Sequence, residues 1–385
     1  MTRADTDKNA GIYIHIPFCR SKCPYCDFYS LPSLALEEAY TDALCRELKT
    51  KESLQGQVVL PADKITADSI YLGGGTPSQL KPVSAVKILT AAQEGFKVTP
   101  EAEITAECNP SSEGLSEFLS AAHSVGLGRL SIGLQSADSA ERRALGRLGG
   151  AEEAAKAVKT AQSLGIHNIS VDIMLGIPFQ TGASLKKSLD FALSLNVSHI
   201  SAYMLKIEPG TLFYRRRESL SLPDEDSTAD MYLFMCRYLQ DKGMRQYEIS
   251  NFCFDGLYSR HNMKYWTLDD YLGFGASAHS FYNGRRFYFS RDINAFIAGA
   301  PAVFEDTGGG AGEYIMLGLR LDTGIEFSVL YERFGVRADE KFYSWAKKLV
   351  TAGFIRLSQS SFSLTHSGFL VSNSIIGKAI DLLIN

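Results

Sequence analysis

The chain has 385 residues, enough for two or three domains or for one barrel with additions. Hydrophobic residues make up 45% and charged residues 21%, as in soluble globular proteins. The net charge of -4 argues against a general nucleic-acid binder, and no apolar run is long enough to span a bilayer. The first eight residues carry acids and no apolar core, so we expect neither a signal nor a transit peptide.

The first predicted strand leads directly into a loop with three cysteines. Over residues 11–16 the isoleucines share one face, and Tyr13 and His15 share the other. His15 is either a hydrogen-bonded strand histidine or a residue that supports the loop. The face of the strand that carries Tyr13 and His15 therefore leads directly into the cysteine loop.

The three cysteines of this loop have a Cys-x3-Cys-x2-Cys spacing, at Cys19, Cys23 and Cys26. Three thiolates at this spacing can hold one side of an iron–sulfur cube and leave one iron open to a small molecule. A zinc ion bound by the three thiolates and His15, or three free thiols, are the alternatives. Seven cysteines in total, an odd number with three in one loop, predict no disulfide framework and a reducing compartment, the cytoplasm.

Strand, loop and helix then alternate along the first half of the chain. We expect helices over about 35–49, from 83, and over 113–125, 138–165 and 182–195, and further strands over 69–72, 103–107, 129–135, 168–175 and 199–205. Such alternation implies right-handed crossovers and a parallel sheet. Six units predict an α/β fold, a partial (β/α)6 barrel over residues 1–206.

Polar residues stand where these predicted strands end. The second strand runs into the glycines 73–75, the third ends at Glu107, the fourth at Gln135, and the fifth carries Asp172 in an apolar run. Chemistry in parallel barrels gathers at the carboxyl ends of the strands. Each residue alone could be a structural hydrogen-bonding group, but together they predict a shared polar ligand.

The alternation fades after residue 206. Residues 207–307 are predicted to be an aromatic-rich extension with a helix over 231–242, a strand over 246–252 and the motif His261-Asn262-x-x-Tyr265-Trp266. A glycine-rich hinge begins at 308. Residues 308–385 combine a helix stopped near Gly353, two short strands and a further helix, which predicts a small winged-helix-like α+β domain. Because it has few clustered basic residues, we expect packing or docking and no DNA binding.

Several motifs together resemble the oxygen-independent coproporphyrinogen III oxidases and the related HemW-type heme chaperones, which are radical S-adenosyl-L-methionine (radical SAM) proteins. The resemblance covers nearly the whole chain and rests on the segments 13–19, 23–28, 73–78, 107–110, 131–136, 145–147, 172–174, 176–178, 247–252, 261–266 and 317–320. It implies a 4Fe-4S cluster on the three loop cysteines, with SAM on the open iron.

By matching motif positions, the resemblance also implies which residues contact these cofactors. It implies that SAM is lined by Tyr13, Gly74, Glu107, Gln135, Arg147 and Asp172. It implies that Gly75, Thr76 and Tyr25 match positions that contact a second SAM in the oxidases. Glycine backbone groups, carboxylates, an amide and a guanidinium can all hydrogen-bond the polar groups of SAM.

The branch of the family decides the expected function. The oxidases have a further cysteine two residues after the third, where this chain has Phe28. The His261 motif resembles the HemW branch, whose members bind heme and pass it to apo-hemoproteins. We therefore expect a heme chaperone with His261 as heme ligand and His279 as a weaker candidate. The alternative is an oxygen-independent coproporphyrinogen III oxidase-type enzyme of porphyrin biosynthesis.

Two departures from the family pattern affect the details of the site. HemW proteins usually carry a histidine where this chain has Gly149, and a glycine where it has Phe179. The expected partners are a heme or porphyrin ligand and an apo-hemoprotein acceptor, with no nucleic acid. The sequence leaves room for a homodimer and for peripheral membrane contact.

Overall fold

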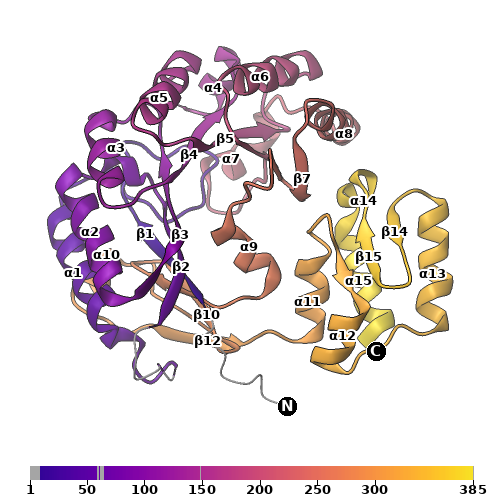
Figure 1. Ribbon diagram of the computed structural model, residues 1–385. Coiled ribbons are helices and arrows are strands. Elements are labelled where there is room, and N and C mark those ends of the chain that lie inside the picture. Colours follow the sequence, from indigo (N-terminus) through magenta and orange to yellow (C-terminus); the bar gives the residue numbers. More distant parts are fainter. Residues whose placement is uncertain (1–8, 59, 61–64, 148, 385) are drawn as a thin grey trace. The chain divides into compact units, whose positions relative to one another are not determined.

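The computed structural model describes residues 9–58, 60, 65–147 and 149–384. They form two compact units (Figure 1). The first unit comprises Met1–Pro223 and Asp270–Thr307, and the second comprises Asp224–Asp269 and Gly308–Asn385. The domain boundaries that we expect from the sequence, after residues 206 and 307, remain predictions. The predicted extension 207–307 supplies residues to both units.

Parallel strands in chain order form the barrel part of the first unit. The sheet order β1-β2-β3-β4-β5-β6 places each strand beside the next, and every adjacent pair is parallel. The strands are β1 (Ala10–Ile16), β2 (Thr66–Gly74), β3 (Lys97–Cys108), β4 (Arg129–Gln135), β5 (Asn168–Leu175) and β6 (His199–Met204). The predicted α/β fold with a partial (β/α)6 barrel is confirmed.

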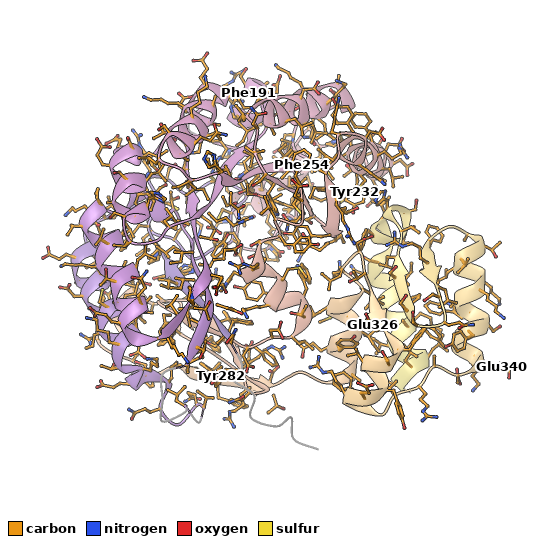
Figure 2. All side chains as sticks on the ribbon, in the orientation of Figure 1. Phe191, Tyr232, Phe254, Tyr282, Glu326 and Glu340 are labelled. Carbon is orange, nitrogen blue, oxygen red and sulfur yellow. The ribbon has the colours of Figure 1, made fainter. Side chains whose placement is uncertain are left out.

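Helices cover the outer side of this curved sheet (Figure 1). They are α1 (Glu37–Thr50), α2 (Pro82–Gly95), α3 (Leu115–His123), α4 (Ser139–Ala144), α5 (Ala151–Ser163), α6 (Gly182–Ser194) and α10 (Ile293–Ile297). The short helix α7 (Leu212–Arg215) instead lies beside the cysteine loop, where the Phe213 N–H donates to the Pro24 carbonyl. In α1, Tyr40, Leu44 and Leu48 are fully buried at helical spacing. Side chains fill the space enclosed by the strands (Figure 2). The helices predicted across 138–165 are α4 and α5, and Gly149 and Gly150 lie between them.

A four-stranded addition extends the sheet beyond β1. Strand β9 (Tyr271–Phe274) pairs with β1 in parallel, and β10 (His279–Tyr282), β11 (Arg285–Tyr288) and β12 (Val303–Thr307) follow antiparallel. Asn283 and Gly284 join β10 to β11 with φ of 50° and 73°. The sequence prediction missed this hairpin, although an Asn-Gly pair between short strands is a strong hairpin signal.

The second unit contains a hairpin, a helix pair and the C-terminal domain. Its helices are α8 (Glu225–Asp241), α9 (Arg260–Thr267), α11 (Ala311–Gly318), α12 (Phe327–Phe334), α13 (Glu340–Thr351), α14 (His366–Leu370) and α15 (Ser372–Ile384). Its strands are β7 (Arg245–Glu248), β8 (Asn251–Cys253), β13 (Ile325–Glu326), β14 (Ile355–Leu357) and β15 (Ser361–Leu364). The sheet order β13-β15-β14, with α12 and α13, agrees with the predicted winged-helix-like domain.

One predicted strand of this unit is wrong. Residues 246–252 are two antiparallel strands, β7 and β8, separated by Ile249 and Ser250. The Ile249 N–H instead donates to the Arg320 carbonyl at 2.9 Å, so the chain turns at this point. No helix in the part of the chain that the structure describes is long and apolar enough to cross a membrane.

Phe179, one of the two departures from the family pattern, has a strained backbone. It lies after β5 with φ of 67°, the left-handed region that a glycine adopts without cost. Its N–H donates to the Ser221 carbonyl at 2.9 Å, and its side chain is 60% exposed. The ring therefore contributes little burial to offset the backbone strain, which costs about 1–2 kcal/mol for an ordinary residue.

We predict that Phe179→Gly raises the free energy of unfolding by about 0.5–1 kcal/mol, because relief of strain exceeds the extra chain entropy of glycine. Urea denaturation followed by circular dichroism measures this change. Phe179→Ala is the matched control, since alanine loses the ring but keeps the strained Cβ. An equal gain from both variants would contradict the strain argument.

Candidate functional site

Backbone hydrogen bonds close the cysteine loop at its neck. The Cys19 N–H donates to the Leu31 carbonyl at 3.0 Å, and the Leu31 N–H donates to the Pro17 carbonyl at 2.7 Å. Below this neck, His15 Nε2 lies 2.9 Å from the Tyr29 carbonyl oxygen. These contacts join the end of β1 to the chain that returns from the loop, so the loop leaves and rejoins the fold at one fixed point.

His15 acts as a structural residue of β1. Its ring is 3% exposed, and its Nδ1 lies 3.0 Å from the Tyr13 hydroxyl. Burial lowers the pKa of His15 to about 4, so the ring is neutral at physiological pH. Since Tyr13 and Tyr29 occupy both ring nitrogens, His15 does not fit the predicted alternative in which it binds zinc.

The three cysteine thiols lie together on one short loop. Cys19, Cys23 and Cys26 are free thiols of intermediate exposure on one short loop. Among the described residues, no three Cys, His, Asp or Glu side chains converge on one point where a metal ion could bind. Thiolates that bind different irons of a cube do not have to converge in this way, whereas four zinc ligands do.

The glycine run at the end of β2 lies against the end of β1. Gly74 has φ of 104°, and a Cβ built on it would lie 2.4 Å from Cε1 of His15. A Cβ on Gly75 would lie 2.7 Å from the carbonyl oxygens of Ile16 and Phe18. Only glycine therefore allows this approach of the two backbones.

Glu107, at the end of β3, is tied to this glycine run. Its two oxygens accept from the Tyr71 hydroxyl at 2.9 Å and from the Gly74 N–H at 3.0 Å. Burial is the main cause that raises the pKa of Glu107 to about 7, and the charge of Asp172 raises it further. The carboxyl groups of Glu107 and Asp172, which belong to different strands, are thus close enough for the charge of Asp172 to raise the pKa of Glu107.

Asp172 and Arg147 form the other half of this polar group. Asp172 accepts from the Ser131 hydroxyl at 2.9 Å, and burial raises its pKa to about 6 while Ser131 and Arg147 act against the rise. Arg147 donates to the Gly133 carbonyl at 2.5 Å and has Nη1 3.9 Å from the Cys23 sulfur. A guanidinium thus lies between the cysteine loop and the strand ends.

Gln135 ends β4 in a strained conformation. Its φ is 69°, it is 4% exposed, and the pairing of β4 with β5 shifts register between Gly133 and Gln135. The Tyr203 hydroxyl donates to Gln135 Oε1 at 3.0 Å. Backbone strain of this kind persists where the surroundings hold it, and such places cluster at functional sites.

The remaining predicted cofactor residues flank this group. Tyr13 stacks on Tyr71 with ring centroids 6.3 Å apart. Tyr25 packs against Phe213 at 6.1 Å and against a buried apolar cluster that includes Met174. Thr76 has its hydroxyl 3.3 Å from the Cys19 sulfur.

Sequence reasoning missed three residues that hold the predicted side chains in place. Tyr71 binds Glu107, Ser131 binds Asp172 and Tyr203 binds Gln135. Each is a polar-capable residue with an apolar residue on either side of it in the strand. That pattern could have identified them, as it did identify Asp172.

The two candidate heme ligands lie in different units. His261 in α9 is fully buried, with Nε2 2.9 Å from the Tyr265 hydroxyl, and burial is the main cause that lowers its pKa to about 3. His279 in β10 is exposed, stacks on Tyr288 with centroids 5.2 Å apart and lies 3.6 Å from Glu305. His261 is therefore already engaged, whereas His279 is accessible.

The two departures also have a place in the structure. Gly149 has φ of 88°, and a Cβ there would lie 2.8 Å from Cβ of Ser111. A histidine at this position would need the local backbone to move. Phe28 is 67% exposed, and its carbonyl accepts from Lys22 Nζ at 3.0 Å across the cysteine loop.

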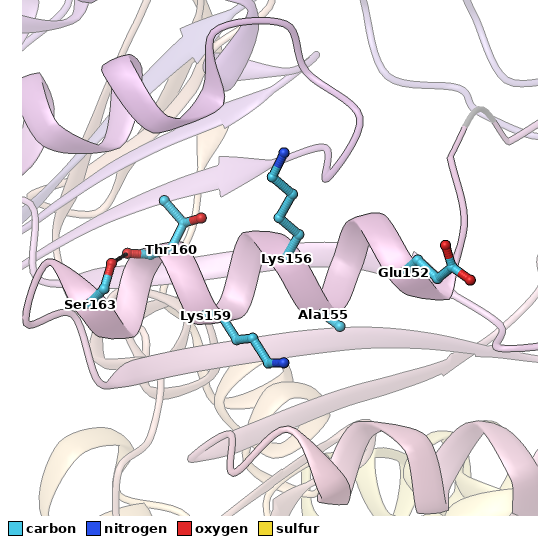
Figure 3. A pocket seen from close by; sticks show the side chains of 6 residues that line it. All are labelled: Glu152, Ala155, Lys156, Lys159, Thr160 and Ser163. Carbon is cyan, nitrogen blue, oxygen red and sulfur yellow. Dashed lines mark hydrogen bonds between the residues drawn. The ribbon is translucent and has the colours of Figure 1, made fainter.

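A hollow on the outer surface of α5 is unrelated to these residues. Its lining comes from one face of that helix, as Figure 3 shows: Glu152, Ala155, Lys156, Lys159, Thr160 and Ser163. These are ordinary residues of a solvated helix face, and none of them is a predicted site residue. We assign no function to this hollow.

We predict that Glu107 makes stability depend on pH. A carboxyl group whose pKa is raised from 4.5 to about 7 stabilises the fold below the lower value, and this stabilisation is lost as pH rises through the higher one. Between about pH 5 and pH 8, the unfolding free energy of Glu107→Gln should rise by roughly 2–3 kcal/mol relative to that of the parent chain. Urea denaturation of the cluster-free protein measures the difference.

The control for this prediction is Glu117→Gln, which removes an exposed carboxylate on α3. It measures what the loss of one exposed carboxylate does by itself. Glutamine also loses one hydrogen bond with Tyr71 or Gly74, but that loss is the same at every pH. A Glu107→Gln difference that does not change with pH would contradict the prediction.

Comparison with known proteins identifies the family. Residues 13–192 match the Radical SAM superfamily, and residues 311–371 match the HemN C-terminal domain. The heme chaperone HemW of Bacillus subtilis is 34% identical over 95% of this chain and 97% of its own length, and HemW of Mycobacterium tuberculosis is 31% identical over 95% and 93%.

A solved structure has the same fold. Coproporphyrinogen III oxidase (HemN) from Escherichia coli, described as a radical SAM enzyme, superposes with a TM-score of 0.79 over 96% of this chain and 90% of its own, at 19% identity. At that identity the likeness concerns the fold alone. The near-complete match to the HemW proteins goes further, and the chain belongs to the HemW family within the radical SAM superfamily.

Proposed function

We propose that this protein is a heme chaperone with a radical SAM core, which binds heme and transfers it to apo-hemoproteins. The observation that carries the proposal is the cysteine loop. Its three free thiols lie at the carboxyl end of β1, on a loop closed at its neck by Leu31. Similarity to HemW over nearly the whole length of both chains supports the same function.

In this proposal Cys19, Cys23 and Cys26 hold a 4Fe-4S cluster and leave one iron open. The absence of a cysteine at Phe28, together with the partial exposure of all three thiols, supports such an open corner. Arg147, with Nη1 3.9 Å from the Cys23 sulfur, places positive charge beside the ligands. This charge offsets part of the cost of gathering three thiolates in one place.

SAM is proposed to bind beside the cluster, among the strand ends. A SAM molecule bound at such a cluster is a source of radical chemistry. Glu107 and Asp172 are the acceptors suited to its amino and ribose groups, and Arg147 is the donor suited to its carboxylate. Tyr13, Gly74 and Gln135 complete the proposed set. A second SAM at Tyr25, Gly75 and Thr76 remains a prediction.

His261 is the proposed heme ligand. Histidine is a standard axial ligand of heme iron, and the neutral ring that binding requires is favoured by the lowered pKa of His261. Its Nε2 is bonded to Tyr265 in the free chain, so coordination through this atom must displace the Tyr265 hydroxyl. Heme binding is therefore expected to come with a local rearrangement of α9.

The proposed surroundings follow from the same residues. All seven cysteines are free thiols, which supports a reducing compartment, proposed to be the cytoplasm. The proposed partner is an apo-hemoprotein that accepts the heme. A homodimer and a peripheral membrane contact remain predictions.

We predict that His261→Ala weakens heme binding at least tenfold, because it removes the axial ligand. The measurement is an anaerobic heme titration of cluster-containing protein, followed by the Soret band. Tyr265→Phe should keep the Soret band, since it removes only the hydrogen-bond partner of Nε2. His279→Ala is the control and should leave the titration unchanged.

Two outcomes would contradict the proposal. Loss of the Soret shift in His279→Ala, with His261→Ala unaffected, would move the ligand to β10. Absence of any heme binding by the parent chain, together with SAM-dependent decarboxylation of coproporphyrinogen on the same sample, would favour the oxidase alternative. Iron analysis of that sample separately tests the cluster.

A further inference from the structure

We propose that Thr76 is a positioning residue that sets the reduction potential of the cluster, through a hydrogen bond from its hydroxyl to the Cys19 sulfur. The Thr76 hydroxyl oxygen lies 3.3 Å from that sulfur. The inference rests on the proposed function only in that Cys19 must be a cluster ligand. It differs from the role in second-SAM binding that the family resemblance implies for Thr76.

The backbone holds Thr76 beside Cys19. The Thr76 N–H donates to the Phe18 carbonyl at 2.7 Å, and the Gly75 N–H donates to the Ile16 carbonyl at 2.9 Å. Phe18 is the residue directly before Cys19. These two hydrogen bonds therefore hold the segment after β2 against the segment after β1, within one residue of Cys19.

The position of Thr76 in the chain limits how its side chain can turn. Gly75 cannot carry a side chain, so Thr76 is the first residue after the glycine run that can. Its backbone is extended, with φ of -143°, as expected for a residue before a proline, and its carbonyl accepts from the Gln79 N–H at 2.9 Å. Threonine is also β-branched, which leaves few rotamers at χ1.

The three sulfurs have different hydrogen-bond donors. Cys23 faces the Arg147 guanidinium at the longer distance of 3.9 Å and is hydrogen-bonded to the Tyr25 side chain. The Phe28 N–H is the hydrogen-bond donor at Cys26. A backbone amide cannot be removed by a side-chain substitution. Removing the charge of Arg147 would also remove its other contacts. On Cys19, the Thr76 hydroxyl is a contact that a near-isosteric change removes.

The direction of the effect follows from charge. When Cys19 is a thiolate, it has no proton to give, so the hydroxyl must be the donor. Reduction of the cluster adds one electron, and no bond is formed or broken. The extra negative charge spreads onto the sulfurs. A hydrogen bond to sulfur stabilises the reduced form more than the oxidised form. Removing the hydroxyl therefore makes the potential more negative.

The test uses the full chain with its cluster reconstituted anaerobically and without SAM. A redox titration followed by electron paramagnetic resonance gives the midpoint potential. Thr76→Val should shift it to a more negative value at equal iron content, and Thr76→Ser should return it close to that of the parent chain. Thr351→Val, on the exposed end of α13, is the control and should cause no shift.

Three results would overturn the inference. One is an unchanged potential in Thr76→Val, and another is a serine variant that behaves like the valine variant. The third is failure of both Thr76→Val and Thr76→Ala to hold iron while their cluster-free chains remain folded, because Thr76 would then be an assembly residue. A parent chain without iron would instead refute the cluster proposal itself.

Discussion

The close approach of the glycine run of β2 to the end of β1 is the constraint on which the site depends. A side chain on Gly74 would meet the His15 ring, and one on Gly75 would meet the carbonyls before Cys19. Because these two residues have no side chains, the backbones pair beyond the end of the regular sheet. This pairing brings Thr76 to the cysteine loop and the Gly74 N–H to Glu107.

The polar groups around this pairing are costly for a chain without a ligand. Glu107 and Asp172 both have a raised pKa, mainly because burial disfavours their charged forms. Hydrogen bonds from Tyr71 and Ser131 offset only part of that cost. A ligand with an amino group and hydroxyls would add donors to these carboxylates, so an arrangement that costs stability in the free chain favours binding.

The two proposed cofactor sites differ in how far their residues are already arranged to bind a ligand. The strand-end residues are held by the sheet. Glu107 and Asp172 each accept from a residue on the preceding strand, and Gln135 on β4 accepts from Tyr203 on β6. His261 instead lies on a short helix and is bonded to Tyr265 one turn later. A rigid cluster site and a heme ligand that must break a local bond to act fit a protein that keeps one cofactor and passes on another.

The sequence alone predicted the barrel, the cysteine spacing and the polar residues at the strand ends. These features follow from the periods of strands and helices and from local spacing, which are properties of short segments. The β9–β12 addition was missed because its strands are short, and the 246–252 strand was misjudged because its turn lacks Gly, Pro or Asn at Ile249-Ser250. Which atoms meet depends on contacts between distant segments. Thr76 meets Cys19 across 57 positions of the chain and Tyr203 meets Gln135 across 68. His261 is buried because other segments, α11 among them, pack around α9, so only the folded chain defines these three features.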